Sequence, residues 1–126
     1  MVLGAALYAS TPAEAAYEIY FRTPSGNIEC SVFEPKRPDI GTVRCVVLST
    51  KNRVGEPLEW TLDFWRHVEV FRTNQGVVGR PVRTLEYGRT LQLGFVRCVS
   101  RRTGLTCLSR HSGHGFTLSQ QRQVTF

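Results

Sequence analysis

The sequence predicts an all-β protein: a small, disulfide-bonded antiparallel sandwich or barrel with at most one short helix. Apolar and polar residues alternate with a period of two over most of the chain, which is the pattern of half-buried strands. The 11 glycines and 6 prolines fall mainly between these stretches and set turns about every 8–12 residues, as in sandwiches and barrels. Four cysteines fit two disulfides, which would support a modest core.

The first predicted hairpin joins two alternating segments, Tyr17–Arg22 and Asn27–Phe33. Between them Thr23–Gly26 reads Thr-Pro-Ser-Gly, where proline and glycine supply the backbone angles of a turn. A third strand is expected over Val43–Leu48, which is rich in β-branched residues. The N-terminal part of the domain is therefore predicted to hold one hairpin and a third strand.

The middle of the chain is ambiguous. Trp60–Phe71 fits an irregular helix, although its end, Val68–Phe71, looks strand-like, and Thr73–Gly79 is a glycine-containing loop. Further strands are expected on both sides of the turn Tyr87-Gly88-Arg89 within Thr84–Leu93, and at Phe95–Val99, Leu105–Leu108, Phe116–Leu118 and Gln123–Phe126.

The cysteine pairing follows from hairpin geometry. Cys98 and Cys107 flank a hairpin that turns at Arg101–Gly104, and a two-residue loop there places the two cysteines opposite each other. Opposed positions lie within the reach of a disulfide. Cys30 and Cys45, in two strand-like segments, then form the second pair, and the alternative is four free buried thiols.

The N-terminal residues suggest export. An apolar run, Val2–Ala9, is followed by small residues and by Ala13-Glu14-Ala15, which fits the A-x-A rule for signal cleavage. No Lys or Arg precedes the run, so 1–16 is interpreted as a signal-peptide remnant, and a disordered lead-in or an amphipathic helix is the alternative. We expect 17–126 to form one β-rich domain and no segment to span a membrane. Together with the disulfides, this predicts a secreted, periplasmic or cell-envelope protein.

Four segments carry a resemblance to a known family: FRTPSGNIEC (Phe21–Cys30), LEYGRT (Leu85–Thr90), FVRCVSRRTGLTC (Phe95–Cys107) and SGHGFTLSQQRQ (Ser112–Gln123). In this order they resemble a family of small exported bacterial proteins that is catalogued as a domain of unknown function. The resemblance implies an exported β-rich domain held by disulfides, and it implies no activity. Relatives often hold two further cysteines around a C-D-x-x-W segment, whereas Gly55–Phe64 reads GEPLEWTLDF here. The absence of both cysteines from this segment is consistent with the loss of a third disulfide that relatives hold.

The charge balance suggests an anionic ligand. The chain has 16 Lys+Arg against 10 Asp+Glu, for a net charge of +6, and most of the cations are arginines, which bind phosphate and carboxylate with two hydrogen bonds. Export favours an anionic envelope polymer or a glycan as partner, no motif supports nucleic acid, and a monomer is expected. The candidate anion patch comprises Arg97, Arg101, Arg102, Arg110 and His114. The alternative is an ordinary solvated face.

Three other kinds of site find weaker support. His111 and His114 follow Cys98 and Cys107, but the spacing is not that of a zinc site and a cystine cannot bind zinc, so we expect no metal and no cofactor. A nucleophilic triad would combine Ser25 or Ser112 with His114 and Asp63, and neither serine lies in a G-x-S-x-G motif. Acid–base chemistry would use Glu69 or Glu86 with His67 or His114.

The sequence therefore favours a non-enzymatic exported domain that binds an anionic or glycan ligand. The alternative is a small secreted hydrolase of ribonuclease-like type, which uses glutamate, histidine and arginine. The two tryptophans, Trp60 and Trp65, are expected mainly in the core, and an exposed one would offer a platform for a sugar ring.

Overall fold

The computed structural model describes residues 17–34, 41–48, 57–65, 67–73, 78–80 and 82–126. The expected signal-peptide remnant, 1–16, lies outside the described residues. The part of the chain that is described contains no helix long and apolar enough to cross a lipid bilayer.

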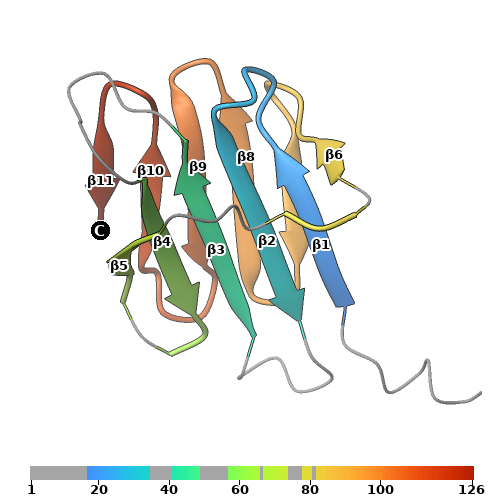
Figure 1. The fold of residues 1–126 in the computed structure, drawn as a ribbon. Coiled ribbons are helices and arrows are strands. Elements are labelled where there is room, and N and C mark those ends of the chain that lie inside the picture. The colour runs from blue at the N-terminus through green and yellow to red at the C-terminus, as the bar shows by residue number, and fades with distance from the viewer. Residues whose placement is uncertain (1–16, 35–40, 49–56, 66, 74–77, 81) are drawn as a thin grey trace, which may run out of the picture.

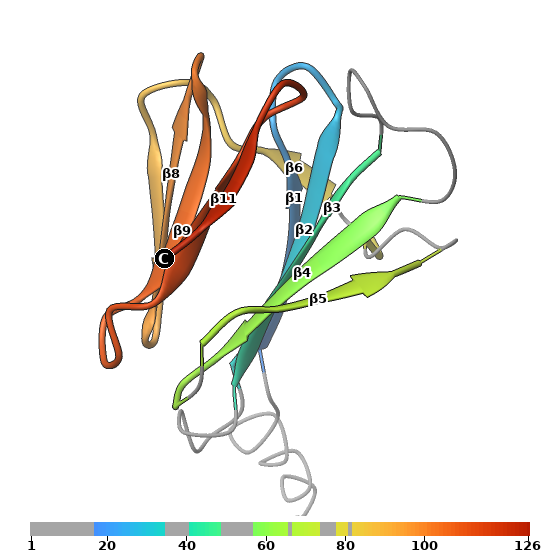
Figure 2. The ribbon, with the colours of Figure 1, turned by 90° about the vertical axis from the view of Figure 1, so that its left-hand side faces the viewer.

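Two β-sheets stack face to face and form a sandwich (Figures 1 and 2). A six-stranded sheet has the order β5-β4-β3-β2-β1-β6, and a five-stranded antiparallel sheet has the order β11-β10-β9-β8-β7. The strands are β1 (Tyr17–Arg22), β2 (Ile28–Glu34), β3 (Thr42–Val47), β4 (Leu58–Asp63), β5 (Glu69–Arg72), β6 (Val82–Thr84), β7 (Thr90–Leu93), β8 (Val96–Arg101), β9 (Gly104–Ser109), β10 (Gly115–Leu118) and β11 (Gln123–Thr125). The predicted all-β sandwich is confirmed, and the described residues include no helix.

The six-stranded sheet departs from a purely antiparallel arrangement at one edge. There β6 pairs with β1 in parallel, with Tyr20 opposite Val82. In the ambiguous stretch Trp60–Phe71, the residues up to Asp63 belong to β4 and those from Glu69 belong to β5, which pairs with β4 in antiparallel. The described residues of this stretch form no irregular helix, and its strand-like end is confirmed as a strand. Trp60 and Leu62 alternate into the core on β4, which explains the strand.

The core lies between the two sheets. Its largest fully buried side chains include Phe21 and Leu62 from one sheet and Leu105, Phe116 and Leu118 from the other. Each sheet also contributes one cystine, so sulfur and hydrocarbon groups fill the same interior.

Both predicted disulfides are confirmed. Cys30 on β2 stands directly opposite Cys45 on β3, and Cys98 on β8 stands opposite Cys107 on β9. All four cysteines are 0% exposed. Two buried disulfides indicate an oxidising, extracytoplasmic environment.

An ion pair stabilises the outer face of the six-stranded sheet. Arg44 Nε lies 2.9 Å from Glu59 Oε2 and Arg44 Nη2 lies 3.2 Å from Oε1, while the Thr61 hydroxyl donates to Oε2 at 3.1 Å. The hydrogen bond from Arg44 lowers the pKa of Glu59, against the opposing effect of burial, and the Thr61 hydrogen bond acts in the same direction as Arg44. The folded state therefore favours the Glu59 carboxylate.

This ion pair makes stability depend on pH. Because the pKa of Glu59 is lower in the folded state, the stabilisation is complete above the ordinary carboxyl pKa of about 4.3 and is lost as the pH falls through the folded value. We expect Glu59→Gln to lower the free energy of unfolding near neutral pH and to reduce its fall on acidification. Urea unfolding at a series of pH values measures this, with Glu86→Gln in the β6–β7 loop as control. Equal acid sensitivity in wild type and Glu59→Gln would contradict the assignment.

Candidate functional site

Four connections meet at one end of the sandwich, the upper end in Figure 1. They are the β1–β2 turn, the β6–β7 loop, the β8–β9 turn and the β10–β11 turn. They come from four parts of the chain that are far apart in sequence, around residues 23–27, 85–89, 101–104 and 119–122. The fold therefore brings them together around one place.

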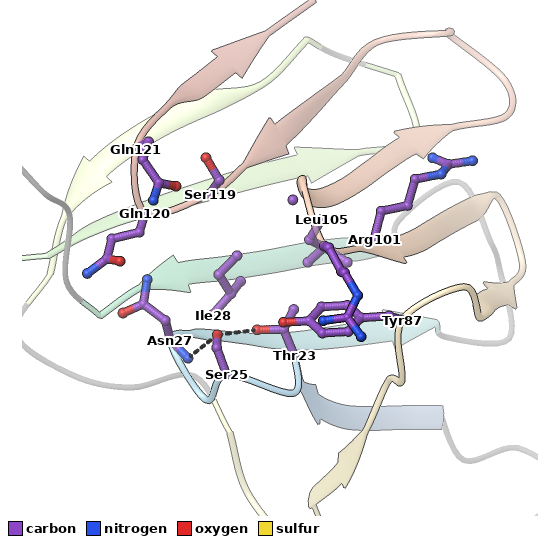
Figure 3. Close-up of a pocket in the computed structure, with 12 residues that line it drawn as sticks. Thr23, Ser25, Asn27, Ile28, Tyr87, Arg101, Leu105, Ser119, Gln120 and Gln121 are labelled. Carbon is purple, nitrogen blue, oxygen red and sulfur yellow. Dashed lines mark hydrogen bonds between the residues drawn. The ribbon is translucent and has the colours of Figure 1, made fainter.

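A cavity of about 400 Å³ lies among these connections (Figure 3). This volume lies within the usual range for small-ligand sites, about 300–1,000 Å³. The side chains of Ile28 and Leu105 contribute an apolar part, and both are buried members of the core. Most of the other lining residues carry hydroxyl, amide or guanidinium groups. The cavity therefore has an apolar floor from the core and hydrogen-bonding groups around it.

The β1–β2 turn supplies hydroxyl and amide groups. Gly26, with φ +77°, allows the tight turn, and its N–H donates to the Thr23 carbonyl at 2.9 Å. The Ser25 hydroxyl oxygen accepts a hydrogen bond from the Asn27 N–H at 3.2 Å and lies 3.4 Å from the Thr23 hydroxyl (Figure 3). Thr23, Ser25 and Asn27 are thus held together along one side of the cavity.

The β8–β9 turn supplies two guanidinium groups. Arg102 Cζ lies 5.0 Å from the centre of the Tyr87 ring, in a cation–π contact that places the guanidinium beside this ring. The turn at Gly88, with φ +86°, presents Tyr87, and the Gly88 N–H donates to the Ser100 carbonyl of β8 at 2.7 Å. The side chain of Arg101 extends away from Thr23 and Ser25, so it lies at the margin of the cavity (Figure 3).

The β10–β11 turn completes the lining with Ser119, Gln120 and Gln121. The Ser119 hydroxyl donates to the Arg122 carbonyl at 3.0 Å and accepts from the Arg122 N–H at 3.0 Å, which closes this turn. Glutamine amides both donate and accept, as sugar hydroxyls do. The cavity therefore combines guanidinium, hydroxyl and amide groups, and its described lining holds no carboxylate, imidazole or thiol.

The residues of the predicted anion patch lie at different places in the structure. Arg101 and Arg102 lie at the cavity, and Arg97 lies on the exposed face of β8. Arg110 and His114 lie in the β9–β10 connection at the opposite end, where the Arg110 N–H donates to the Phe95 carbonyl before β8 begins. A six-residue strand is about 20 Å long, which separates the two groups.

The opposite end of the sandwich carries an aromatic and histidine cluster. The Phe64 and His111 rings stack with centroids 4.1 Å apart, and the edge of Trp65 meets His111 with centroids 4.8 Å apart. Trp65 is 60% exposed, whereas Trp60 is 3% exposed and belongs to the core. Trp65 is thus the exposed tryptophan that a sugar platform would require.

The candidate acid–base histidines lie near each other in this cluster. The ring centroids of His67 and His114 are 6.1 Å apart, and His114 Nδ1 lies 3.3 Å from the Phe126 carbonyl oxygen. Glu69 follows on β5, two residues after His67, whereas Glu86 lies at the cavity end in the β6–β7 loop. Of the two candidate glutamates, Glu69 is therefore the one on the same side of the molecule as the two histidines.

Two of the weakly supported alternatives, the nucleophilic triad and the zinc site, can be compared with the structure. Ser25 lies at the cavity end and His114 at the opposite end, so these two residues do not form a triad. The Ser112 hydroxyl oxygen accepts the His114 N–H at 3.2 Å, which is a turn contact. The thiols that a zinc site would need are joined in the Cys98–Cys107 disulfide.

Sequence reasoning did not single out Thr23, Asn27, Tyr87, Gln120 and Gln121 as site residues. Thr23 and Tyr87 were placed in turns and Asn27 at the start of a strand, and no role was given to Gln120 and Gln121. A local motif does not reveal which distant turns it will meet in the fold. The one signal in the sequence that points to this site is that several polar connections each join two strands at the same end of the predicted sandwich.

Comparison of the chain with protein-family models, with curated proteins and with solved structures gives no match.

Proposed function

We propose that this protein is an exported binding domain of the cell envelope, without enzymatic activity, and that its cavity takes an anionic glycan. The observation that carries the proposal is the Arg102 guanidinium, which contacts the Tyr87 ring in a cavity that also presents hydroxyl and amide groups. The two buried disulfides support an oxidising location outside the cytoplasm.

The chemistry of the lining favours this ligand class. A guanidinium binds a carboxylate or a phosphate with parallel hydrogen bonds, and these charge-assisted bonds are the strong ones. Serine, threonine, asparagine and glutamine groups match the donor and acceptor pattern of sugar hydroxyls. The net charge of +6 attracts anionic polymers over longer distances.

A titration of the full chain with trigalacturonate, an acidic trisaccharide, tests the proposal. Arg102→Ala is expected to weaken binding about tenfold to a hundredfold, the usual effect of losing a hydrogen-bonded charge. Arg97→Ala is the matched control, because Arg97 is exposed on β8 and outside the cavity lining. Binding should also weaken as salt rises. Equal affinity of Arg102→Ala and wild type, or equal binding of neutral maltotriose, would contradict the proposal.

One observation favours a second function, a ribonuclease-like hydrolase: the approach of His67 and His114 to 6.1 Å between ring centroids. Two neighbouring imidazoles can serve as general acid and general base. RNA turnover that is lost in His67→Ala or His114→Ala, and kept in Arg102→Ala, would support the hydrolase and overturn the binding proposal.

A further inference from the structure

A second cavity lies on the outer face of the six-stranded sheet. Its volume is about 680 Å³, and it is lined by Arg22, Val78, Gly79, Arg80 and Val82. Because β5 and β6 stand at opposite edges of this sheet, the connection between them has to cross it. The described part of that connection, 78–80, passes over the face of the sheet that is turned away from the core (Figure 1).

A close approach of Gly79 to Tyr20 places this segment on the sheet. Phe21 is 0% exposed in the core, so its neighbours Tyr20 and Arg22 point to the outer face. A Cβ atom at Gly79 would lie 2.7 Å from Tyr20 Cζ, so the absence of a side chain there allows the contact. Arg80 follows directly, and the contact therefore brings its guanidinium to the same cavity as Arg22.

The two arginines of this cavity have no carboxylate partner among the described residues. Glu29 stands opposite Arg22 in the β1–β2 register but forms no ion pair with it. Arg44, by contrast, contacts Glu59 at 2.9 Å on the same face of the sheet. Two guanidinium groups that share a cavity repel each other, so a bound anion would stabilise their arrangement.

We propose that this cavity binds a phosphate monoester. Two guanidinium groups match the charge of such a group, which is about −1.5 to −2 near neutral pH, and arginine binds phosphate oxygens with parallel hydrogen bonds. Val78 and Val82 add aliphatic walls, and charge-assisted hydrogen bonds are stronger in less polar surroundings. A cavity of this volume also has room for the molecule that carries the phosphate.

This site is independent of the proposed function. The first cavity includes Ile28 and Leu105 of the core, whereas the second lies against the opposite face of the same sheet. One ligand therefore need not reach both, and each site can be removed without the other.

Titration of the ¹⁵N-labelled full chain with glycerol 3-phosphate tests the site. Amide shifts that saturate are expected at Arg22, Val82 and 78–80. Acetate, which carries one charge on a carboxylate, is the comparison ligand and should bind at least about tenfold more weakly. Arg102→Ala should keep the affinity for glycerol 3-phosphate at this site.

The double variant Arg22→Ala/Arg80→Ala is expected to weaken binding of glycerol 3-phosphate at least about tenfold. Its charge-matched control is Arg83→Ala/Arg97→Ala, which removes two exposed arginines that line neither cavity and should leave the affinity unchanged. Circular dichroism checks that both double variants are folded.

Vesicles that contain phosphatidic acid distinguish a lipid headgroup from a soluble ester. Cosedimentation that is lost in Arg22→Ala/Arg80→Ala would support the site and assign the lipid, whereas binding of glycerol 3-phosphate alone would support it and assign a soluble ester. Binding of neither probe, equal affinity in Arg22→Ala/Arg80→Ala and wild type, or equal binding of acetate would overturn the site. Each of these results leaves the proposed function standing, because that function is tested through Arg102.

Discussion

Replacement of Cys98 and Cys107 together by alanine is expected to lower the free energy of unfolding by about 3 kcal/mol. The disulfide closes a loop with a sequence separation of 9 residues, so its loss restores conformational freedom to the unfolded chain. It also removes two side chains that are 0% exposed from the core between the sheets. Urea unfolding followed by circular dichroism, on wild type and the double variant at the same pH, measures the difference.

The Cys30–Cys45 pair provides an internal comparison. Its sequence separation is 15 residues, so the same reasoning gives a loss that is similar or slightly larger. With both disulfides removed, we expect the domain to be largely unfolded at physiological temperature, since its core is modest. A folded protein whose urea midpoint stays the same after complete reduction would contradict this account of its stability.

Gly115→Ala is expected to destabilise the protein by about 2–3 kcal/mol, the upper part of the range for overpacking a closed interior. A Cβ atom at Gly115 would collide with the Cys107 carbonyl oxygen and would lie 2.8 Å from Leu108 Cα. Both are backbone atoms of β9, so no side-chain rotation relieves the contact. Gly115 also exchanges two hydrogen bonds with Phe126 at 3.0 Å, which fixes its position from the other side.

A second glycine is the matched control. Gly113 has φ +81°, and a Cβ atom there would meet nothing within 4 Å. Asparagine tolerates this backbone region better than other side chains, so Gly113→Asn should cost much less than Gly115→Ala. Thermal or urea unfolding compares the two variants. Equal losses of unfolding free energy in the two variants would show that the close packing of β10 against β9 does not cause the destabilisation.

The parts of the fold that were predictable from the sequence are those that local turns determine. The short turn after Arg101 fixes the β8–β9 register, and that register places Cys98 against Cys107. In the same way Thr-Pro-Ser-Gly fixes the first hairpin. A turn sets which residues stand opposite each other, so pairing between neighbouring strands follows from a short stretch of sequence.

Pairing between distant strands was not predictable in this way. β6 has three residues, too few to show an alternating pattern, and its partner β1 lies far back in the chain. The ambiguity at Trp60–Phe71 arose because one alternating strand, the following connection and a short exposed edge strand were read as a single segment. The boundaries of the two strands become clear only from their pairing in the folded sheet.

The candidate site was predictable only where a local turn determines it. Arg101 and Arg102 stand out as cations at a hairpin turn, and the structure places them at the cavity. Arg110 is close to them in sequence, but the length of β9 carries it to the other end of the sandwich. Tyr87 and the polar β10–β11 turn join the site only through packing of whole strands, which local patterns do not encode.

The most direct test of the central claim is to locate the ligand by nuclear magnetic resonance. The ¹⁵N-labelled full chain is titrated with trigalacturonate, and amide shifts are followed residue by residue. Binding in the proposed cavity predicts the largest changes at 23–27, 87–88, 101–105 and 119–121. Changes concentrated instead around Trp65, His67, His111 and His114, at the opposite end, would contradict the assignment of the site.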